Sequence, residues 1–373
     1  MSDKCLAIIG ASYLQLPLVE KAREMGFRTI GFAWEEGAVC RAILDCFYPI
    51  SIVEKERILS ICQEERIDGI CTIASDVAAP TVAFVAEKLG LAGNTYQSAL
   101  SANDKYLMRL AFSKVGVPCP GFQRVSSTKD INQVNLNYPV IVKPCDRSGS
   151  LGVIKVESQD KLENAVESAL NYSFSHRAMI EEYVGGREIS VEFISYQGKH
   201  YPLMITDKVT TGAPHFVELE HHQPASLTTD DYERVYHLTE LALDALGVSD
   251  GASHTEYKIT EDGKVYIIEL GARMGGDFIG SDLVRLSTGY DFVRGVIEVA
   301  TKQFTPPVKS IKQYSGVYFL SQETARLLRV FNRLEDYPEI VGAKRTDDVL
   351  RSITCSAERS GYLIYQSSHK VVL

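Results

Sequence analysis

Residues 138–156 read YPVIVKPCDRSGSLGVIKV, and this stretch decides the fold more than any other part of the 373-residue chain. Its first apolar run predicts a buried strand that delivers Lys143, and the run ending at Val156 predicts a returning strand. The loop between them contains Gly149 and Gly152, so its backbone N–H groups could meet phosphate oxygens beside the Lys143 ammonium. A plain hairpin loop with glycine for turn chemistry is the alternative that composition leaves open.

The first hundred residues alternate short apolar runs with helical patterns, which is typical of a doubly wound parallel sheet. The pattern predicts strands at 5–9, 28–32, 47–50 and 69–73, and helices at 14–25, 54–65 and 77–89. The turn at Gly10 lacks the later glycines of a dinucleotide fingerprint, which disfavours a nicotinamide dehydrogenase.

A further helix is predicted to start in the capping residues around Asp104 and to end before Gly116. Lys105 lies in its first turn, where the helix dipole does not favour a cation. A solvated surface lysine and a ligand-binding lysine are both compatible with this segment.

Residues 178–193 predict a strand, a short connector and a second strand around the sequence EEYVGGRE, which begins at Glu181. A connector between two domains can offer backbone groups to a flat heterocycle, with Glu188 near enough for ribose hydroxyls. Exposed strand acids are the alternative.

Two more strands, at 254–259 and 265–270, flank the turn EDGK and predict a hairpin. Strands of that length can bring Glu256 and Glu269 to one face. Paired carboxylates beside phosphates suit Mg²⁺, a hard ion that takes oxygen ligands. Arg273 could stabilise charge on a transferred phosphoryl group. A surface hairpin with solvated acids remains the alternative.

These motifs in this order resemble the ATP-grasp superfamily over roughly residues 1–300, in its carbamoyl-phosphate-synthase-like and amino-acid-ligase branch. The resemblance implies a mixed α/β and α+β fold with a preATP-grasp domain (1–112), a small lid (113–184), a larger sheet domain (185–304) and a small C-terminal subdomain (305–373). It implies that nucleotide lies between lid and large domain.

Carried over residue by residue, the resemblance implies ATP-binding, metal-binding and acyl-phosphate-binding roles. The ATP-binding residues are Lys105, Lys143, Ser148, Gly149, Ser150, Gly152, Glu181, Glu182, Val184 and Glu188. The metal ligands for Mg²⁺ or Mn²⁺ are Glu256 and Glu269, and Arg273 binds the acyl phosphate. Gly271 departs from the family, which often has a metal-binding Asn there, so the second metal's coordination is in doubt.

Residues 205–224 resemble the substrate-side loop of the amino-acid ligases. Lys208 is a candidate catalytic residue that could meet phosphate. The candidate substrate residues are Glu218, Glu220, His221, His222, Gly275 and Gly276. A solvated histidine pair is the alternative for this polar loop.

Bulk composition excludes several classes of protein. Net charge is −9 and the pI is near 5.5, so no global basic field favours nucleic acid or an anionic membrane surface. No window approaches a membrane span and the N-terminus lacks a signal-peptide order, so we expect a cytoplasmic enzyme. We expect partners to be small-molecule carboxylate and amine substrates, and a homodimer is an open oligomeric state.

The implied activity is ATP-dependent ligation of a carboxylate and an amine through an acyl phosphate, with release of ADP and phosphate. A carbamoyl-phosphate-synthase-like kinase of a small carboxylate is the nearest alternative, although this chain has one copy of the motif set. A noncatalytic nucleotide-binding module is the other.

Overall fold

The computed structural model describes residues 4–147, 149 and 151–373. Its N-terminal part is a four-stranded parallel sheet of order β3-β2-β1-β4, which confirms the predicted strands. The elements are β1 (Cys5–Ile9), α1 (Leu16–Glu24), β2 (Arg28–Ala33), β3 (Cys46–Pro49), α2 (Lys55–Glu64), β4 (Gly69–Cys71) and α3 (Ala79–Leu89). β1 is fully buried, as expected for the centre of a sheet covered on both faces.

Two helices, α4 (Tyr96–Asn103) and α5 (Lys105–Val115), lead from this sheet to the next domain. The Asp104 carboxylate caps α5 by accepting hydrogen bonds from the N–H groups of Tyr106 and Leu107, at 2.9 and 3.0 Å. The helix ends at Gly116, whose φ of +74° suits glycine. The cap therefore fixes Lys105 as the first residue of the helix.

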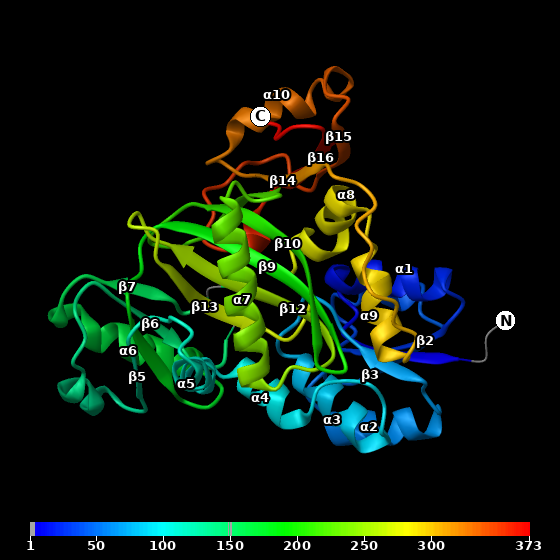
Figure 1. The fold of residues 1–373 in the computed structure, drawn as a ribbon, viewed down its shortest axis with the longest axis horizontal. Helices are drawn as coiled ribbons and strands as arrows, with labels where there is room; N and C mark the ends of the chain where they lie inside the picture. The colour runs from blue at the N-terminus through cyan, green and yellow to red at the C-terminus, as the bar shows by residue number, and fades with distance from the viewer. Residues whose placement is uncertain (1–3, 148, 150) are drawn as a thin grey trace.

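The small lid is an antiparallel sheet of order β5-β8-β6-β7 with one helix on its face. Its elements are β5 (Phe122–Val125), β6 (Val140–Pro144), β7 (Ile154–Val156), α6 (Leu162–Tyr172) and β8 (Ala178–Glu182). β6 and β7 pair as the sequence predicted, with Val142 opposite Ile154. Figure 1 shows this lid at one end of the molecule and the N-terminal sheet at the other.

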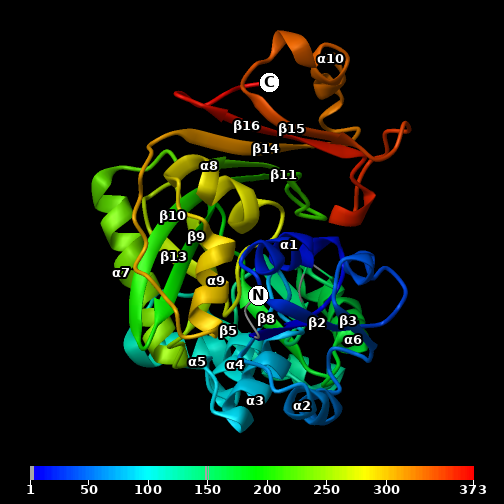
Figure 2. The same ribbon diagram turned by 90° about the vertical axis from the view of Figure 1, so that its right-hand side faces the viewer.

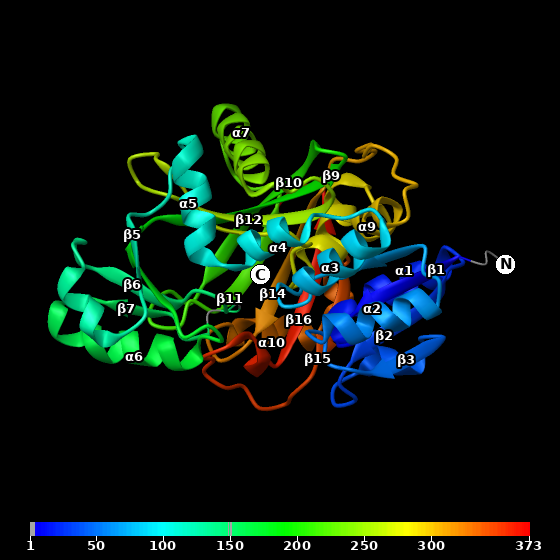
Figure 3. The ribbon, with the colours of Figure 1, turned by 90° about the horizontal axis from the view of Figure 1, so that it is seen from below.

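The large sheet has eight strands in the order β13-β12-β9-β10-β11-β14-β16-β15. The strands are β9 (Arg187–Tyr196), β10 (Lys199–Thr210), β11 (Glu218–Gln223), β12 (Gly251–Ile259), β13 (Val265–Gly271), β14 (Tyr314–Leu320), β15 (Ile340–Arg345) and β16 (Gly361–Ser367). The helices of this part are α7 (Thr229–Leu246), α8 (Val284–Thr288), α9 (Phe292–Ala300) and α10 (Leu328–Phe331). Figure 3 shows α7 lying across β10 and β12.

Residues 305–373 do not build a sheet of their own. β14 pairs with β11 from His222 opposite Gly316, so β14, β16 and β15 extend the large sheet. Figure 2 shows these strands stacked above β11, with the segment between β15 and β16 descending toward the N-terminal domain. The tail is therefore placed to contribute side chains to a site on the large sheet.

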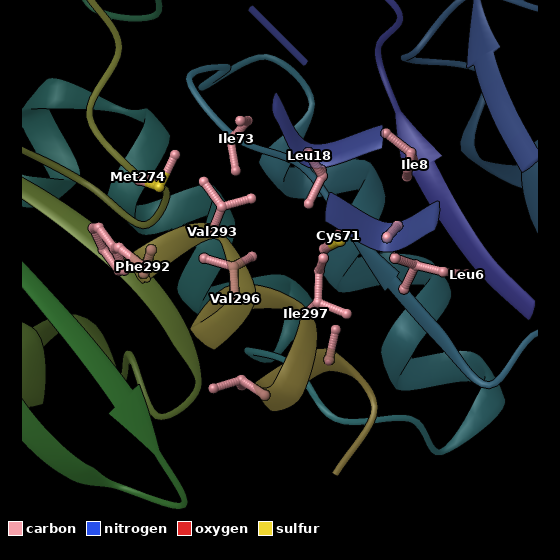
Figure 4. Close-up of a cluster of buried hydrophobic side chains, with 14 of the residues drawn as sticks. Leu6, Ile8, Leu18, Cys71, Ile73, Met274, Phe292, Val293, Val296 and Ile297 are labelled. Atoms are coloured by element: carbon pink, nitrogen blue, oxygen red, sulfur yellow. The ribbon is translucent and has the colours of Figure 1, made fainter. Parts of the chain in front are cut away.

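One apolar core joins the N-terminal sheet to the large domain. α9 packs Val293, Val296 and Ile297 against Leu6 and Leu18, as Figure 4 shows. Met274 and Ile73 lie at the edge of the same cluster. Burial of this shared surface holds the carboxyl end of β4 close to the segment that follows β13.

No helix in the described ranges is long and apolar enough to cross a membrane.

Candidate active site

A cleft lies between the lid and the large sheet, and most of the predicted site residues line it. Among the predicted residues, those lining the cleft are Lys105, Lys143, Gly149, Glu181, Glu182, Val184, Glu188, Glu218, Glu256, Glu269 and Arg273. Ser148 and Ser150 fall outside the described residues. Gly152, Lys208, Glu220, His221, His222, Gly275 and Gly276 are not in its lining.

Lys143 reaches the cleft from β6 with its side chain 6% exposed. Its ammonium lies 2.5 Å from one carboxylate oxygen of Glu181, and Arg109 of α5 lies 2.6 Å from the other. Burial raises the pKa of Glu181, but the opposing effect of Arg109 and Lys143 is larger. The pKa therefore lies below its ordinary value, and the carboxylate is ionised. Glu181 therefore holds the lysine in position with its side chain, whereas the sequence suggested a backbone role.

The connector between β8 and β9 forms one wall of the cleft through Tyr183 and Val184. Gly186 has φ +111°, and a Cβ there would lie 2.2 Å from the Ile259 carbonyl oxygen. Only glycine lets the connector approach β12 this closely. Glu188 follows at the start of β9, and its carboxylate lies 3.3 Å from the Lys258 ammonium.

Glu256 and Glu269 are directly opposite each other in the β12–β13 ladder, which confirms that the hairpin brings them to one face. Their side chains are 25% and 26% exposed toward the cleft. Glu256 lies 2.5 Å from the Lys208 ammonium, and Glu269 lies 2.6 Å from Lys105. Burial raises the pKa of Glu256, but Lys208 and His254 carry it well below its ordinary value.

These two carboxylates fit a magnesium ion that is completed by its nucleotide. Within the described residues, no group of three or more His, Cys, Asp or Glu side chains could hold a metal ion. Mg²⁺ characteristically uses one or two protein carboxylates, substrate phosphates and waters rather than an all-protein cage. Paired acids beside Lys143 match that requirement.

Arg273 makes a bidentate salt bridge with Asp76, which follows β4 in the N-terminal domain. Its Nε and Nη2 atoms donate to the two carboxylate oxygens at 2.8 and 2.9 Å. A Cβ at Gly271 would lie 2.7 Å from Asp76 Oδ1. The pair therefore occupies the room that a side chain at 271 would need.

His254 is a buried residue of the cleft lining for which the sequence predicted no role. Its Nδ1 contacts the Glu192 carboxylate, and its Nε2 lies 3.3 Å from Glu256. Burial lowers the pKa of His254, but Glu192 and Glu256 raise it to about 9. The Gly275 N–H donates to Glu192 at 3.0 Å, and a Cβ at Gly275 would lie 2.8 Å from His254 Nδ1.

Glu218, the first residue of β11, is the centre of a group of charged side chains at the cleft. Its carboxylate lies 3.6 Å from Lys208 and 3.1 Å from Arg359 of the C-terminal segment. Arg359 also contacts Asp277 at 2.8 Å, and His221 lies 3.9 Å from the same acid. Burial lowers the pKa of His221.

The structure does not bring Glu220 and His222 to this cleft. A β-bulge between Val209 and Thr210 pairs Thr210 with Glu218 but Val209 with Glu220, so the two acids face opposite sides of the sheet. Glu220 lies 2.5 Å from Arg326, and His222 lies 3.0 Å from both Glu220 and the Tyr365 hydroxyl. These contacts are structural.

Sequence reasoning missed Asp76, Arg109, Glu192, Asp277 and Arg359. Arg109 lies one helical turn beyond Lys105, so a 3.6-residue spacing could have suggested it. Asp277 directly follows the candidate substrate residues Gly275 and Gly276, so its position in the sequence could have suggested it. No local signal marks Asp76 or Arg359, because their partners lie 197 and 141 residues away.

The chain is similar to several characterised ligases. It is 28% identical over 245 residues to alanine–anticapsin ligase of Bacillus subtilis, covering 59% of this chain and 51% of that protein. It is 30% identical over 192 residues to D-alanine–D-alanine ligase of Flavobacterium psychrophilum, covering 49% and 57%. The chain thus spans about half the length of the curated relatives it matches.

Among solved structures, L-amino acid ligase from Bacillus licheniformis superposes with a TM-score of 0.82 at 23% identity, over 98% of this chain and 94% of that one. That likeness shows a shared fold. Residues 136–282 match the family model described as an ATP-grasp domain, and they contain β6, the connector, Glu256 and Glu269. This part of the chain, residues 136–282, therefore carries an ATP-grasp domain.

Proposed function

We propose that the protein is an ATP-dependent carboxylate–amine ligase that forms an acyl phosphate and releases ADP and phosphate. One observation carries the proposal: Lys143, the Glu256–Glu269 pair and Arg273, from three separate motifs, line a single cleft. Its relatives with ligase names agree with this chemistry. A cytoplasmic location and a homodimer stay predictions.

In the proposed reaction a substrate carboxylate oxygen attacks the γ-phosphorus of ATP, and the bond to the ADP oxygen breaks. An amine then attacks the acyl carbon, phosphate leaves, and the nitrogen loses a proton to give the amide. Bound Mg²⁺ would neutralise phosphate charge. The protein's part is positioning and charge stabilisation, and no side-chain nucleophile is required.

Each residue has a defined part in this proposal. Glu181 orients Lys143 toward the phosphates, and the Glu256–Glu269 pair holds the metal ion. Asp76 orients the Arg273 guanidinium. Burial lowers the pKa of Arg273, but the Asp76 carboxylate has the larger effect, so the net shift of this pKa is upward. Arg273 therefore stays charged and would stabilise the acyl phosphate. Lys208 balances Glu256 and Glu218 at the substrate end.

The experiment supplies hydroxylamine as a small nucleophile with Mg²⁺–ATP and a panel of carboxylic acids. We expect the correct acid to give a hydroxamate and ADP in equal amounts. ADP and phosphate without hydroxamate would indicate a kinase or phosphatase-like side reaction, and AMP with pyrophosphate would contradict the acyl-phosphate mechanism. Nucleotide binding without turnover on any acid would support a noncatalytic module.

A further inference from the structure

A second cavity of ≈ 470 Å³ lies at the carboxyl edge of the N-terminal sheet. It is lined by the residues that follow all four parallel strands, including Leu14, Trp34, Val53 and Ala74. Ligands of open α/β sheets bind at this edge, and the volume is that of a small-molecule site. Neither the predicted ATP residues nor the metal acids line it.

The chemistry of the cavity favours an apolar group. Trp34, Val53 and Phe174 line it with 71%, 57% and 69% of their surface exposed. Large apolar side chains gathered and exposed in a hollow mark a binding site. Glu36 is the only ionisable side chain among the described lining residues, so the cavity has no cation for a phosphate or carboxylate.

The cavity shares a wall with the reacting centre. Ala74 and Ser75 line it, while the next residue, Asp76, holds Arg273 in the cleft. The Ala74 N–H donates to the Met274 carbonyl oxygen at 3.2 Å, which fixes this wall to the segment behind Arg273. A ligand with its carboxylate at Arg273 would have this hollow on the far side of residues 74–76.

We propose that this cavity binds the apolar group, branched alkyl or aryl, of a small-molecule ligand, on the opposite side of residues 74–76 from Arg273. This preference for an apolar group follows from the lining alone and does not depend on the proposed ligase function.

Phe174 connects the cavity to the lid. It belongs to the lid segment after α6, and its N–H donates to the Asp146 carboxylate at 3.1 Å. The Arg147 guanidinium lies 4.0 Å from the Phe174 ring centroid. Asp146 and Arg147 begin the loop that carries Gly149 into the nucleotide cleft. A ligand that contacts Trp34 and Phe174 together would therefore bridge the N-terminal domain and the lid, which also lines the nucleotide cleft.

Binding can be measured without turnover because Trp34 is the only tryptophan of the chain. We would titrate the nucleotide-free protein with L-phenylalanine, L-leucine, 3-phenylpropionate and L-alanine and follow tryptophan emission. We expect a saturable blue shift with at least one of the three apolar probes and none with L-alanine at the same concentrations. No saturable shift with any apolar probe would overturn the proposal.

A matched pair of variants locates the site. Val53→Asp places a charge in the cavity and should weaken binding of the apolar probe about 10-fold or more. Val308→Asp makes the same change at a residue that is 73% exposed and outside the cavity, and it should bind like the wild type. Equal affinity in the two variants would show that the probe binds elsewhere.

Lid coupling is tested by calorimetry with Mg²⁺ and a nonhydrolysable ATP analogue. In the wild type, saturating apolar probe should tighten analogue binding about 5-fold or more. Phe174→Ala should abolish that enhancement, and retention of it would overturn the coupling. Probe binding without hydroxamate formation would support the cavity proposal and contradict the ligase proposal. Hydroxamate formation without probe binding would support the ligase proposal and contradict the cavity proposal.

Discussion

The two halves of the cleft are built in different ways. In the half that we propose binds nucleotide, candidate ligands come from short motifs on paired strands, such as Glu256 and Glu269 across one hairpin. In the half that we propose binds substrate, ion pairs join distant parts of the chain: Asp76 pairs with Arg273, and Asp277 pairs with Arg359. The pairing of Glu256 with Glu269 is therefore a local property of the hairpin, whereas the Asp76–Arg273 and Asp277–Arg359 pairs exist only when distant segments are packed together.

The sharpest test of the nucleotide half is Glu269→Gln, with Glu256→Gln beside it. Each change keeps the shape but removes a charge that faces the metal and phosphates, so we expect turnover at saturating ATP to fall about 100-fold or more. Mg²⁺-dependent ADP formation is the measurement. Glu261→Gln, in the exposed turn of the same hairpin, is the control and should keep normal activity. Near-normal rates in both cleft variants would remove this hairpin from the active site.

Asp76→Asn probes the substrate half through its longest-range contact. The amide cannot accept both Arg273 donors with full charge, so Arg273 should lose its fixed orientation and kcat should fall about 10-fold. The KM for ATP should stay unchanged, because Asp76 does not contact the nucleotide half. Asp348→Asn, whose side chain is 94% exposed, is the matched control. A rise in the KM for ATP with unchanged kcat would contradict this division of the cleft.

Two glycines test how tightly the halves are joined. Gly271→Ala would place a Cβ 2.7 Å from Asp76 Oδ1, so we expect the free energy of unfolding to fall by about 1–3 kcal/mol. Gly276→Ala is the comparison, because its Cβ meets only the Ala74 side chain at 3.5 Å. Its effect on stability should stay within about 0.5 kcal/mol. Denaturant unfolding of both variants measures the difference. Equal losses of unfolding free energy would mean that the Asp76–Arg273 pair moves aside at little cost.

The smallest expected effect separates the two faces of β11. Glu220→Gln weakens ion pairs with Arg326 and His222 and should reduce the free energy of unfolding by about 1 kcal/mol, without altering substrate KM. Glu218→Gln, on the cleft face, should instead raise the KM for one substrate. Steady-state kinetics with a substrate found in the hydroxamate screen measures the KM of both variants, and denaturant unfolding measures the stability of Glu220→Gln. A raised KM for Glu220→Gln would show that the bulge does not separate these acids.

Some features were predictable from the sequence because they depend on local periodicity. The alternation of apolar runs predicted the parallel sheet, and the β1 prediction at 5–9 matches the structure. The turn around Gly263 predicted the hairpin, and the count of residues across it predicted that Glu256 would meet Glu269. Residues close in sequence must be close in space, so spacing alone sets these contacts.

Other features were decided only by the tertiary structure. A period of two would put Glu218, Glu220 and His222 on one face, but the bulge beside Thr210 turns Glu218 to the other. Asp76 meets Arg273 because α9 packs against the N-terminal sheet and holds the two segments together. Arg359 meets Glu218 because β14 and β16 continue the large sheet from β11. Sequence patterns encode which face of an element is apolar, but contacts between charges far apart in the chain depend on how those faces pack.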